Sequence, residues 1–271
     1  MAKQQIALAG KVAVITGSTR GIGRAIAERY GRAGARVMVS SSRADAVTQA
    51  VGELRAQGIV CEGMACDVSD LSQAQALMRR ALEAFGHVDI WMNNAAVSGP
   101  FGQTLDVPPE EWRRVLEVNV FGCYHGCISA LPHMIAQRAG KIINVSGGGA
   151  VRAQRFLSAY STSKAAIVRL TEGLARDYHD HPYLSFNVLT PGMVPTDMMS
   201  SFRTVGAGAE AIKALPKVMK IFGTTAEETA EVALHMASSA TDGISGKVFE
   251  LMPRRRALWR LATAALRGRL A

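Results

Sequence analysis

Short apolar segments alternate with longer amphipathic segments along nearly the whole chain, and this alternation constrains the fold more than any other feature. Seven segments rich in apolar or β-branched residues are predicted to be strands: Lys11–Thr16, Arg36–Ser40, Ile59–Ala65, Val88–Asn93, Lys141–Val145, Ser185–Thr190 and Lys247–Leu251. Helix-length segments begin between them, near Gly21, Arg43, Asp70, Pro109, Leu157 and Thr225. Such alternation predicts an α/β fold with a doubly wound parallel sheet of about seven strands and helices on both faces.

The sequence indicates one domain. Its 271 residues contain no internal repeat and no linker-like segment, so residues 1–252 are expected to form one α/β domain. The longest stretch between strong elements runs from Met193 to Phe222 and contains Gly206, Gly208 and two prolines. Long loops in compact domains often cover a site, so this stretch is expected to be a loop that acts as a lid.

The positive charge of the chain is concentrated near its C-terminus. The formal net charge is +9, from 31 basic and 22 acidic residues, and six of the arginines lie in residues 253–271, which contain no acid. The remaining 25 basic residues nearly balance the acids. Because no basic patch interleaved with aromatic residues occurs in the body, we expect no nucleic-acid partner.

Residues 253–271 are predicted to form a basic amphipathic tail. Apolar residues recur there at helical spacing, with Arg260 and Arg267 elsewhere: Leu258, Leu261, Ala262, Ala265, Leu266 and Leu270. Three interpretations are open. The helix lies on an anionic membrane, packs across a neighbouring subunit, or extends into solvent. The last two together are favoured over membrane contact.

The sequence also bears on location and on metals. Residues 1–17 contain no long apolar run before a small-residue cleavage site, and no stretch approaches the roughly 20 apolar residues that cross a bilayer. Cys61, Cys66, Cys123 and Cys127 do not suggest a disulfide framework and lack nearby histidines for a zinc site. We therefore expect a cytoplasmic protein with reduced, packed thiols and no metal.

A glycine-rich turn joins the first predicted strand to the first predicted helix. It reads Gly17-Ser18-Thr19-Arg20-Gly21-Ile22-Gly23. Glycines permit a tight turn and a close approach of the backbone to a pyrophosphate, whose charge suits a helix N-terminus. The alternative is a sharp turn that serves only the packing of strand against helix.

Further motifs follow in order along the chain: Asp67-Val68, Asn93-Asn94-Ala95-Ala96, Asn119, Tyr160-x3-Lys164 and Pro191-Gly192-x-Val194-x-Thr196. With the glycine turn, they resemble the short-chain dehydrogenases/reductases in sequence and spacing, from about Ala9 to Leu251. The resemblance implies a Rossmann-type fold and an oxidoreductase that uses a nicotinamide dinucleotide. It also implies cofactor contacts from the turn and from these motifs, with Asp67 facing the adenine.

The choice between the two nicotinamide cofactors is argued from charge. Ser41 stands where NAD-binding folds place an acid for the ribose 2′-hydroxyl, followed by Ser42 and Arg43, and Arg20 lies within the turn. Arginines and hydroxyls without a carboxylate favour a phosphate monoester. We therefore expect NADP(H) rather than NAD(H). The alternative is that Arg43 only opens an exposed helix.

Tyr160 and Lys164 are four residues apart on a predicted helix, so their side chains project from one face. A phenol needs a neighbouring cation to exchange protons near neutral pH, and Lys164 supplies one. The resemblance implies hydride transfer between the nicotinamide and a ketone or secondary alcohol, with Tyr160 as proton donor or acceptor. It also implies that Lys164 holds the nicotinamide ribose and that Asn119 holds a water of the proton relay.

One position departs from the family pattern. Where the family has a serine that donates to the substrate oxygen, this chain has Gly147, and Ser146 precedes it. Three interpretations are open. The glycine run re-aims Ser146; glycine N–H groups, Ser158 or the substrate supply the hydrogen bond; or the protein is a catalytically weak dinucleotide-binding sensor or scaffold. The first two together are favoured, with Ser146 as the candidate catalytic residue.

The substrate is expected to be a small carbonyl compound or alcohol. Methionines and other apolar residues are frequent between Met193 and Phe222, which favours a hydrophobic substrate or the packing of this segment onto the body. The resemblance implies a homodimer or homotetramer associating through helices near residues 109–138 and 157–178.

Overall fold

The computed structural model describes residues 8–200 and 202–266. Its described strands form one parallel sheet in the order β3-β2-β1-β4-β5-β6-β7. The bounds are β1 (Val12–Ile15), β2 (Arg36–Ser41), β3 (Cys61–Ala65), β4 (Ile90–Asn93), β5 (Gly140–Val145), β6 (Leu184–Thr190) and β7 (Val248–Glu250). The order reverses between β1 and β4, which is where doubly wound sheets open a crevice at the carboxyl ends of their strands.

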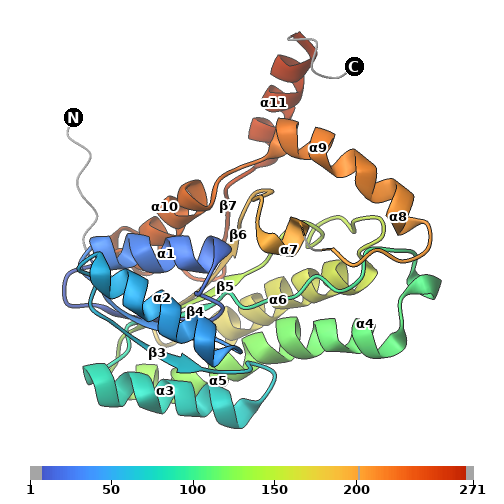
Figure 1. Cartoon of the computed structure of the whole chain (residues 1–271). Helices are drawn as coiled ribbons and strands as arrows, with labels where there is room; N and C mark the ends of the chain where they lie inside the picture. The colour runs from blue at the N-terminus through green and yellow to red at the C-terminus, as the bar shows by residue number, and fades with distance from the viewer. Residues whose placement is uncertain (1–7, 201, 267–271) are drawn as a thin grey trace.

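Helices cover both faces of the sheet (Figure 1). One layer contains α1 (Gly21–Arg32), α2 (Ala44–Ala56) and α10 (Ala226–Ala237), and the other contains α3 (Leu71–Phe85), α5 (Gly122–Ala136) and α6 (Ser158–Asp177). In the first layer, α1 packs on α10, where Tyr30 donates a hydrogen bond to the carbonyl of Ala233 (2.8 Å) and Arg29 pairs with Glu231 (2.6 Å). Each sheet face thus has its own buried apolar core.

The predicted fold class and the order of strands and helices are confirmed. Helix starts follow local chemistry: the Asp70 carboxylate accepts from the backbone N–H groups of Ser72 and Gln73 at the start of α3, and Thr225 with Glu228 forms a capping box at the start of α10. The four cysteines are buried free thiols. No helix in the described part of the chain has the length and apolar character needed to cross a bilayer.

The expectation of a loop between Met193 and Phe222 is wrong. The segment contains α7 (Asp197–Ser200), α8 (Gly208–Ala211) and α9 (Leu215–Phe222). Pro216 lies in the first turn of α9, where its missing N–H breaks no helical hydrogen bond. Bridges join Met193 to Gly223 and Phe101 to Thr204, so the segment is tied down at its base and at its middle.

Two further α-helices, α4 and α11, belong to the described part of the chain. The first, α4 (Pro109–Leu116), continues into α5 through a π-helical turn at Glu117–Phe121. The last, α11 (Arg254–Leu266), follows β7 and stands away from the body of the molecule beyond α9 (Figure 1). Arg267 and Leu270, assigned to the amphipathic pattern of the tail, lie outside the described residues.

Candidate active site

A cavity of about 320 Å³ opens at the carboxyl ends of the strands, at the point where the strand order reverses. It collects most of the site residues expected from the sequence, which come from widely separated motifs. The lining includes Gly17, Thr19, Arg20, Gly21, Ile22, Gly23, Ser41, Ser42, Asp67, Val68, Asn94, Ala95, Ala96, Ser146, Tyr160, Lys164, Pro191, Gly192, Val194 and Thr196. Ser18, Arg43 and Asn119 are not part of the lining.

The glycine turn is locked against the end of β4. Gly17 has φ +64°, and a Cβ there would lie 2.8 Å from Ala95 Cα. The Asn94 side chain donates to the carbonyls of Thr16 (2.9 Å) and Gly17 (3.0 Å), while a Cβ on Gly23 would lie 2.4 Å from Asn94 Nδ2. Tight packing therefore requires glycine at both positions.

The start of α1 suits an anion. The helix begins at Gly21 with no side-chain cap on its N-terminus and no acid in its first turn, so its first N–H groups are available on the lining of the cavity. A pyrophosphate fits this position because backbone N–H groups and the helix dipole both favour negative charge. The residues present therefore fit a dinucleotide cofactor.

Ser18 has a supporting position. Its buried hydroxyl donates to the carbonyl of Ile15 (2.6 Å) and accepts from the backbone N–H of Ser40 (3.0 Å). It therefore ties the glycine turn to the end of β2, and in this structure its side chain serves the turn rather than the cavity.

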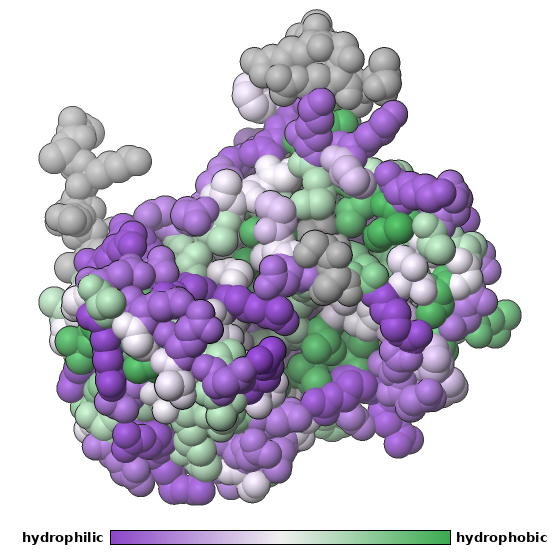
Figure 2. Space-filling view, viewed as in Figure 1, coloured by the Kyte–Doolittle hydropathy of each residue, from purple (hydrophilic) through white to green (hydrophobic). Residues whose placement is uncertain are grey.

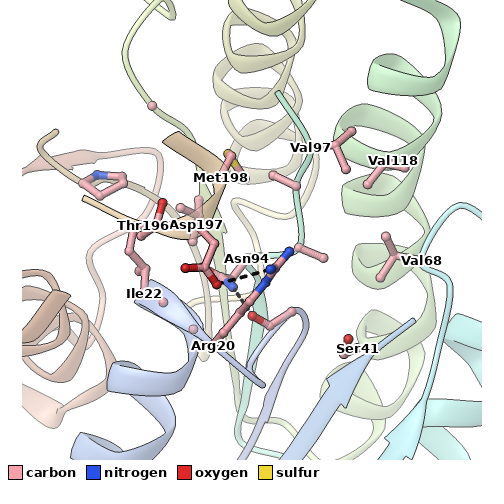
Figure 3. A pocket seen from close by; sticks show the side chains of 18 of the residues that line it. Arg20, Ile22, Ser41, Val68, Asn94, Val97, Val118, Thr196, Asp197 and Met198 are labelled. Atoms are coloured by element: carbon pink, nitrogen blue, oxygen red, sulfur yellow. Dashed lines mark hydrogen bonds and ion pairs between the residues drawn. The ribbon is translucent and has the colours of Figure 1, made fainter. Parts of the chain in front are cut away.

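The expected 2′-phosphate region holds two arginines with different environments. Arg20 faces the cavity and pairs with Asp197 (3.2 Å), while Ser41 stands at the end of β2 (Figure 3). Arg43 caps α2 and pairs with Asp45 through its guanidinium. Of these two arginines, Arg20 lines the cavity and Arg43 does not.

Sequence reasoning missed Arg114 of α4. Its guanidinium donates to Asp67 (2.8 Å) and to Ser69 (2.7 Å), and it lines the cavity beside Asp67. Partial burial opposes ionisation of Asp67, but hydrogen bonds from Ser69 and Arg114 outweigh it and lower the pKa of that carboxyl. Asp67 is therefore an oriented, ionised acceptor, and no motif spacing pointed to its partner.

The Tyr160–Lys164 pair lies on one face of α6 above the end of β5. Lys164 is 2% exposed, its ammonium donates to the carbonyl of Val145 (3.1 Å), and it lies 5.3 Å from the ring centroid of Tyr160. Burial raises the pKa of Tyr160 to about 12 and lowers the pKa of Lys164 to about 8. Tyr160 therefore stays protonated at neutral pH, while Lys164 titrates just above it.

Gly147 occupies the place from which a side chain would reach Tyr160. A Cβ on Gly147 would lie 2.7 Å from the phenol oxygen of Tyr160 and 3.7 Å from Cε of Lys164. The hydroxyl of Ser146 instead donates to the backbone carbonyl of Lys164 (2.9 Å), and Ser146 is 1% exposed. The glycine run thus leaves Ser146 bonded to α6 and the space in front of the phenol empty of a side chain.

Other donors lie nearby. Within residues 8–200 and 202–266, the backbone N–H groups of Gly147 and Gly148 have no hydrogen-bond partner, and both residues line the cavity. Ser158, the other hydroxyl considered from the sequence, accepts a hydrogen bond from Trp112 (3.3 Å) and is not part of the lining. The backbone N–H groups of Gly147 and Gly148 are therefore free hydrogen-bond donors on the cavity lining.

Asn119 lies in the π-helical turn between α4 and α5. Its buried side chain bonds to both backbone groups of Val97 (2.8 and 2.9 Å) and donates to the hydroxyl of Ser163 (3.0 Å). π-Turns often mark functional sites. In this structure, the amide of Asn119 holds the segment after β4 against α6.

Apolar side chains line the cavity in two places. Val97 and Val118 lie on the same side as Val68, and Met198 lies beside Asp197 (Figure 3); hydrophobic residues also gather in a hollow on the face shown in Figure 2. Phe101 packs against Phe156 and Phe202, with ring centroids 5.3 and 5.6 Å apart. Phe156 has φ +68°, a conformation that costs a bulky residue about 1–3 kcal/mol and often accompanies function.

This fold and cavity define the Rossmann class of dinucleotide-dependent oxidoreductases. A family model described as short chain dehydrogenase matches residues 11–205, and the chain belongs to that family. Dehydrogenase/reductase SDR family member 4 of Bos taurus is 35% identical over 240 residues, covering 89% of this chain and 85% of that protein. Glucose 1-dehydrogenase 2 of Bacillus subtilis is 33% identical over 244 residues, covering 88% and 92%.

Solved structures agree on the fold. A gluconate 5-dehydrogenase from Burkholderia cenocepacia, in complex with NADP and tartrate, superposes with a TM-score of 0.81 at 25% identity, covering 92% of this chain and 96% of that one. The chain is thus similar to enzymes that use different small-molecule substrates, and the family alone does not name a substrate for it.

Proposed function

We propose that the protein is an NADP(H)-dependent oxidoreductase that interconverts a ketone and a secondary alcohol. The observation that carries the proposal is the position of Tyr160 and Lys164 on the same cavity as the glycine turn. A phenol beside a buried ammonium is a proton-exchange pair, and the turn supplies a binding place for a pyrophosphate.

In the proposed mechanism, the bound nicotinamide dinucleotide supplies or accepts the hydride. Tyr160 donates its phenolic proton to the carbonyl oxygen during reduction and takes it back during oxidation. Lys164, 5.3 Å from the phenol ring, stabilises the phenolate left after donation. Asn119 and Ser163 keep α6 in register with the segment after β4, which fixes Tyr160 relative to the cavity.

The hydrogen bond that the family's serine would make needs another donor. We propose that the free N–H groups of Gly147 and Gly148 provide it, because both residues line the cavity beside Tyr160. Ser146 is the alternative donor, and it would first have to release the carbonyl of Lys164. The competing function, a weak dinucleotide-binding sensor or scaffold, is favoured only by the glycine at position 147.

The proposed preference for NADP(H) rests on Arg20, Ser41 and Ser42, which line the cavity with no carboxylate at the end of β2. Binding a 2′-phosphate requires Arg20 to exchange its exposed partner Asp197 for the phosphate. Replacing Ser41 by Asp should therefore raise the KM for NADPH about tenfold or more relative to that for NADH. Val60→Asp, at a side chain that is 59% exposed and outside the cavity lining, is the charge-matched control.

Apolar side chains on the cavity lining, among them Val97 and Met198, support the proposal of a hydrophobic substrate.

Exposed aromatic residues support the proposal of a homo-oligomer. Phe121 and Tyr124, at the start of α5, are 53% and 44% exposed. Large exposed aromatic side chains are characteristic of contact surfaces. We propose that these residues take part in a contact with a second copy of the chain.

The deciding experiment is the consumption of NADPH and NADH by purified protein over aliphatic, cyclic and aromatic ketones, with Tyr160→Phe beside the wild type. The proposal requires turnover that prefers NADPH and collapses in the variant. Tight NADPH binding without turnover on any ketone would instead support the binding function.

A further inference from the structure

The last helix, α11, has its polar and apolar faces reversed relative to an ordinary surface helix. Arg256 donates to the carbonyl of Leu251 (3.0 Å) and to Glu228 (2.7 Å), and Arg260 donates to the carbonyl of Gly223. Leu258 and Trp259, on the outer side, are 57% and 66% exposed. A surface helix normally packs its apolar stripe on the body, so this stripe is left open to another partner.

The surroundings of the stripe are basic. Arg255 on α11 and Lys217 and Lys220 on the adjoining helix α9 are exposed, and each has no ion pair with any described residue. Glu228 is already paired with Arg256, and hydrogen bonds from Thr225 and Arg256 lower the pKa of its carboxyl. The exposed surface therefore combines apolar side chains with three cations that make no ion pair with a described residue.

We propose that this surface binds the headgroup region of an anionic phospholipid bilayer. The residues are Lys217, Val218, Lys220, Arg255, Leu258, Trp259 and Leu261, called here the α9–α11 surface. A helix lying in the interface places its apolar side chains at the acyl boundary and its cations among the phosphates, and tryptophan favours that depth. Since no described helix crosses a bilayer, the attachment is peripheral.

Charge decides between a bilayer and a second copy of the chain. A two-fold contact through the α9–α11 surface would bring Lys217, Lys220 and Arg255 against their own copies. Like charges at an interface disfavour association, whereas an anionic headgroup layer complements them. The structure thus favours the membrane interpretation of the tail, which the sequence alone did not favour.

The α9–α11 surface is linked to Met193, where the segment from Met193 to Phe222 begins. The guanidinium of Arg260 donates to the carbonyl of Gly223, and Gly223 forms a β-bridge with Met193. The N–H of Thr224 also donates to the carbonyl of Met193 (2.9 Å). Met193 directly follows Pro191-Gly192 on the cavity lining. A bilayer bound at this surface would therefore lie beside the segment that carries Val194 and Met198 of the cavity lining. If the substrate is hydrophobic, as proposed above, this position brings the site close to substrate dissolved in the bilayer.

The test is binding of the full chain to vesicles of phosphatidylcholine alone and of an equal mixture with phosphatidylglycerol. Sedimentation should show at least about tenfold tighter partition onto the anionic vesicles at low salt, weakening as salt is added. Trp259 emission should shift to the blue, since Trp91 is fully buried and Trp112 is half-buried, and Trp259→Phe should abolish the shift while retaining most of the binding.

Matched variants separate binding through the α9–α11 surface from nonspecific attraction between charges and from self-association. Leu258→Glu with Trp259→Glu should reduce binding at least about tenfold. Leu105→Glu with Val60→Glu adds the same charge at apolar side chains that are 99% and 59% exposed outside this surface, and should leave binding unchanged. The melting temperature of each variant serves as the folding control. Equal partition of the protein onto the two kinds of vesicle would overturn the proposal. So would a double variant that still binds both heparin and anionic vesicles, because binding would then be nonspecific attraction between charges. So would a dimer that depends on Trp259 without any binding to vesicles.

Discussion

The cofactor side and the proposed substrate side of the cavity are held in different ways. On the cofactor side, Ser18 and Asn94 lock a turn whose glycines cannot accept a Cβ. On the substrate side, the segment from Met193 to Phe222 is attached by two bridges and a cluster of aromatic rings. The first arrangement demands particular residues, and the second accepts any apolar side chains that fill the space. A shared cofactor and divergent substrates are the expected consequence.

The largest expected effect is the loss of kcat in Tyr160→Phe, which distinguishes the proton-transfer step from cofactor binding. Tyr160→Phe removes the proton donor and should lower kcat about 10²–10⁴-fold, while the dissociation constant for NADPH stays within about threefold because the glycine turn is untouched. Stopped-flow turnover and fluorescence titration measure the two quantities. Retention of full activity by the variant would show that the proton comes from another group.

Substitutions at Gly147 test which group makes the hydrogen bond that the family's serine would make. Gly147→Ser and Gly147→Ala introduce the same Cβ, 2.7 Å from the Tyr160 oxygen, so both impose the same displacement of the phenol. Only serine adds a donor, and one donor to a developing oxyanion contributes about 10²–10³ in rate. Because the N–H groups of Gly147 and Gly148 are proposed to make this hydrogen bond already, we expect the kcat values of the two variants to agree within about threefold. A serine variant at least about tenfold faster than the alanine variant would mean that the glycine backbone does not fill the role.

The pH profile of cofactor capture reports on Lys164. Its pKa is lowered to about 8 by burial, so the ammonium is present at pH 7 and is lost as the pH rises through 8. Tyr160, with its pKa raised to about 12, stays protonated over that range. During reduction, kcat/KM for NADPH, which reports the free enzyme, should therefore fall about tenfold per pH unit above 8. A plateau extending to pH 10 would contradict the assignment.

The smallest expected effect is on the free energy of unfolding, when each of two glycines is replaced by alanine. Gly17→Ala places a Cβ at φ +64° against Ala95 and should cost about 1–3 kcal/mol of unfolding free energy. Gly173→Ala, inside α6 with nothing within 4 Å of its Cβ, should stabilise by about 0.5–1 kcal/mol. Denaturant titration of both variants gives the difference. Equal stabilities would mean that the turn is looser than its packing implies.

The sequence predicted the sheet, the glycine turn and the positions of Tyr160 and Gly147, because each depends on local periodicity or on a backbone conformation that few residues accept. It did not predict α9, because glycines and prolines in this segment are turn signals, whereas Pro216 lies in the first turn of α9, where a helix accepts proline. Arg114 and the bond from Ser146 to Lys164 were also beyond reach, because both arise from chain segments that meet only after folding.

The contact between α1 and α10 sets an order on the assembly of the cofactor site. The helix that begins at the glycine turn is buttressed by Tyr30 on Ala233 and by Arg29 on Glu231, residues about 200 positions later in the chain. During synthesis on the ribosome, the first strand and helix therefore emerge long before their packing partner exists. The turn has its local supports from Ser40 and Asn94 early in translation, whereas the helix that it begins is fully packed only once α10 has been translated.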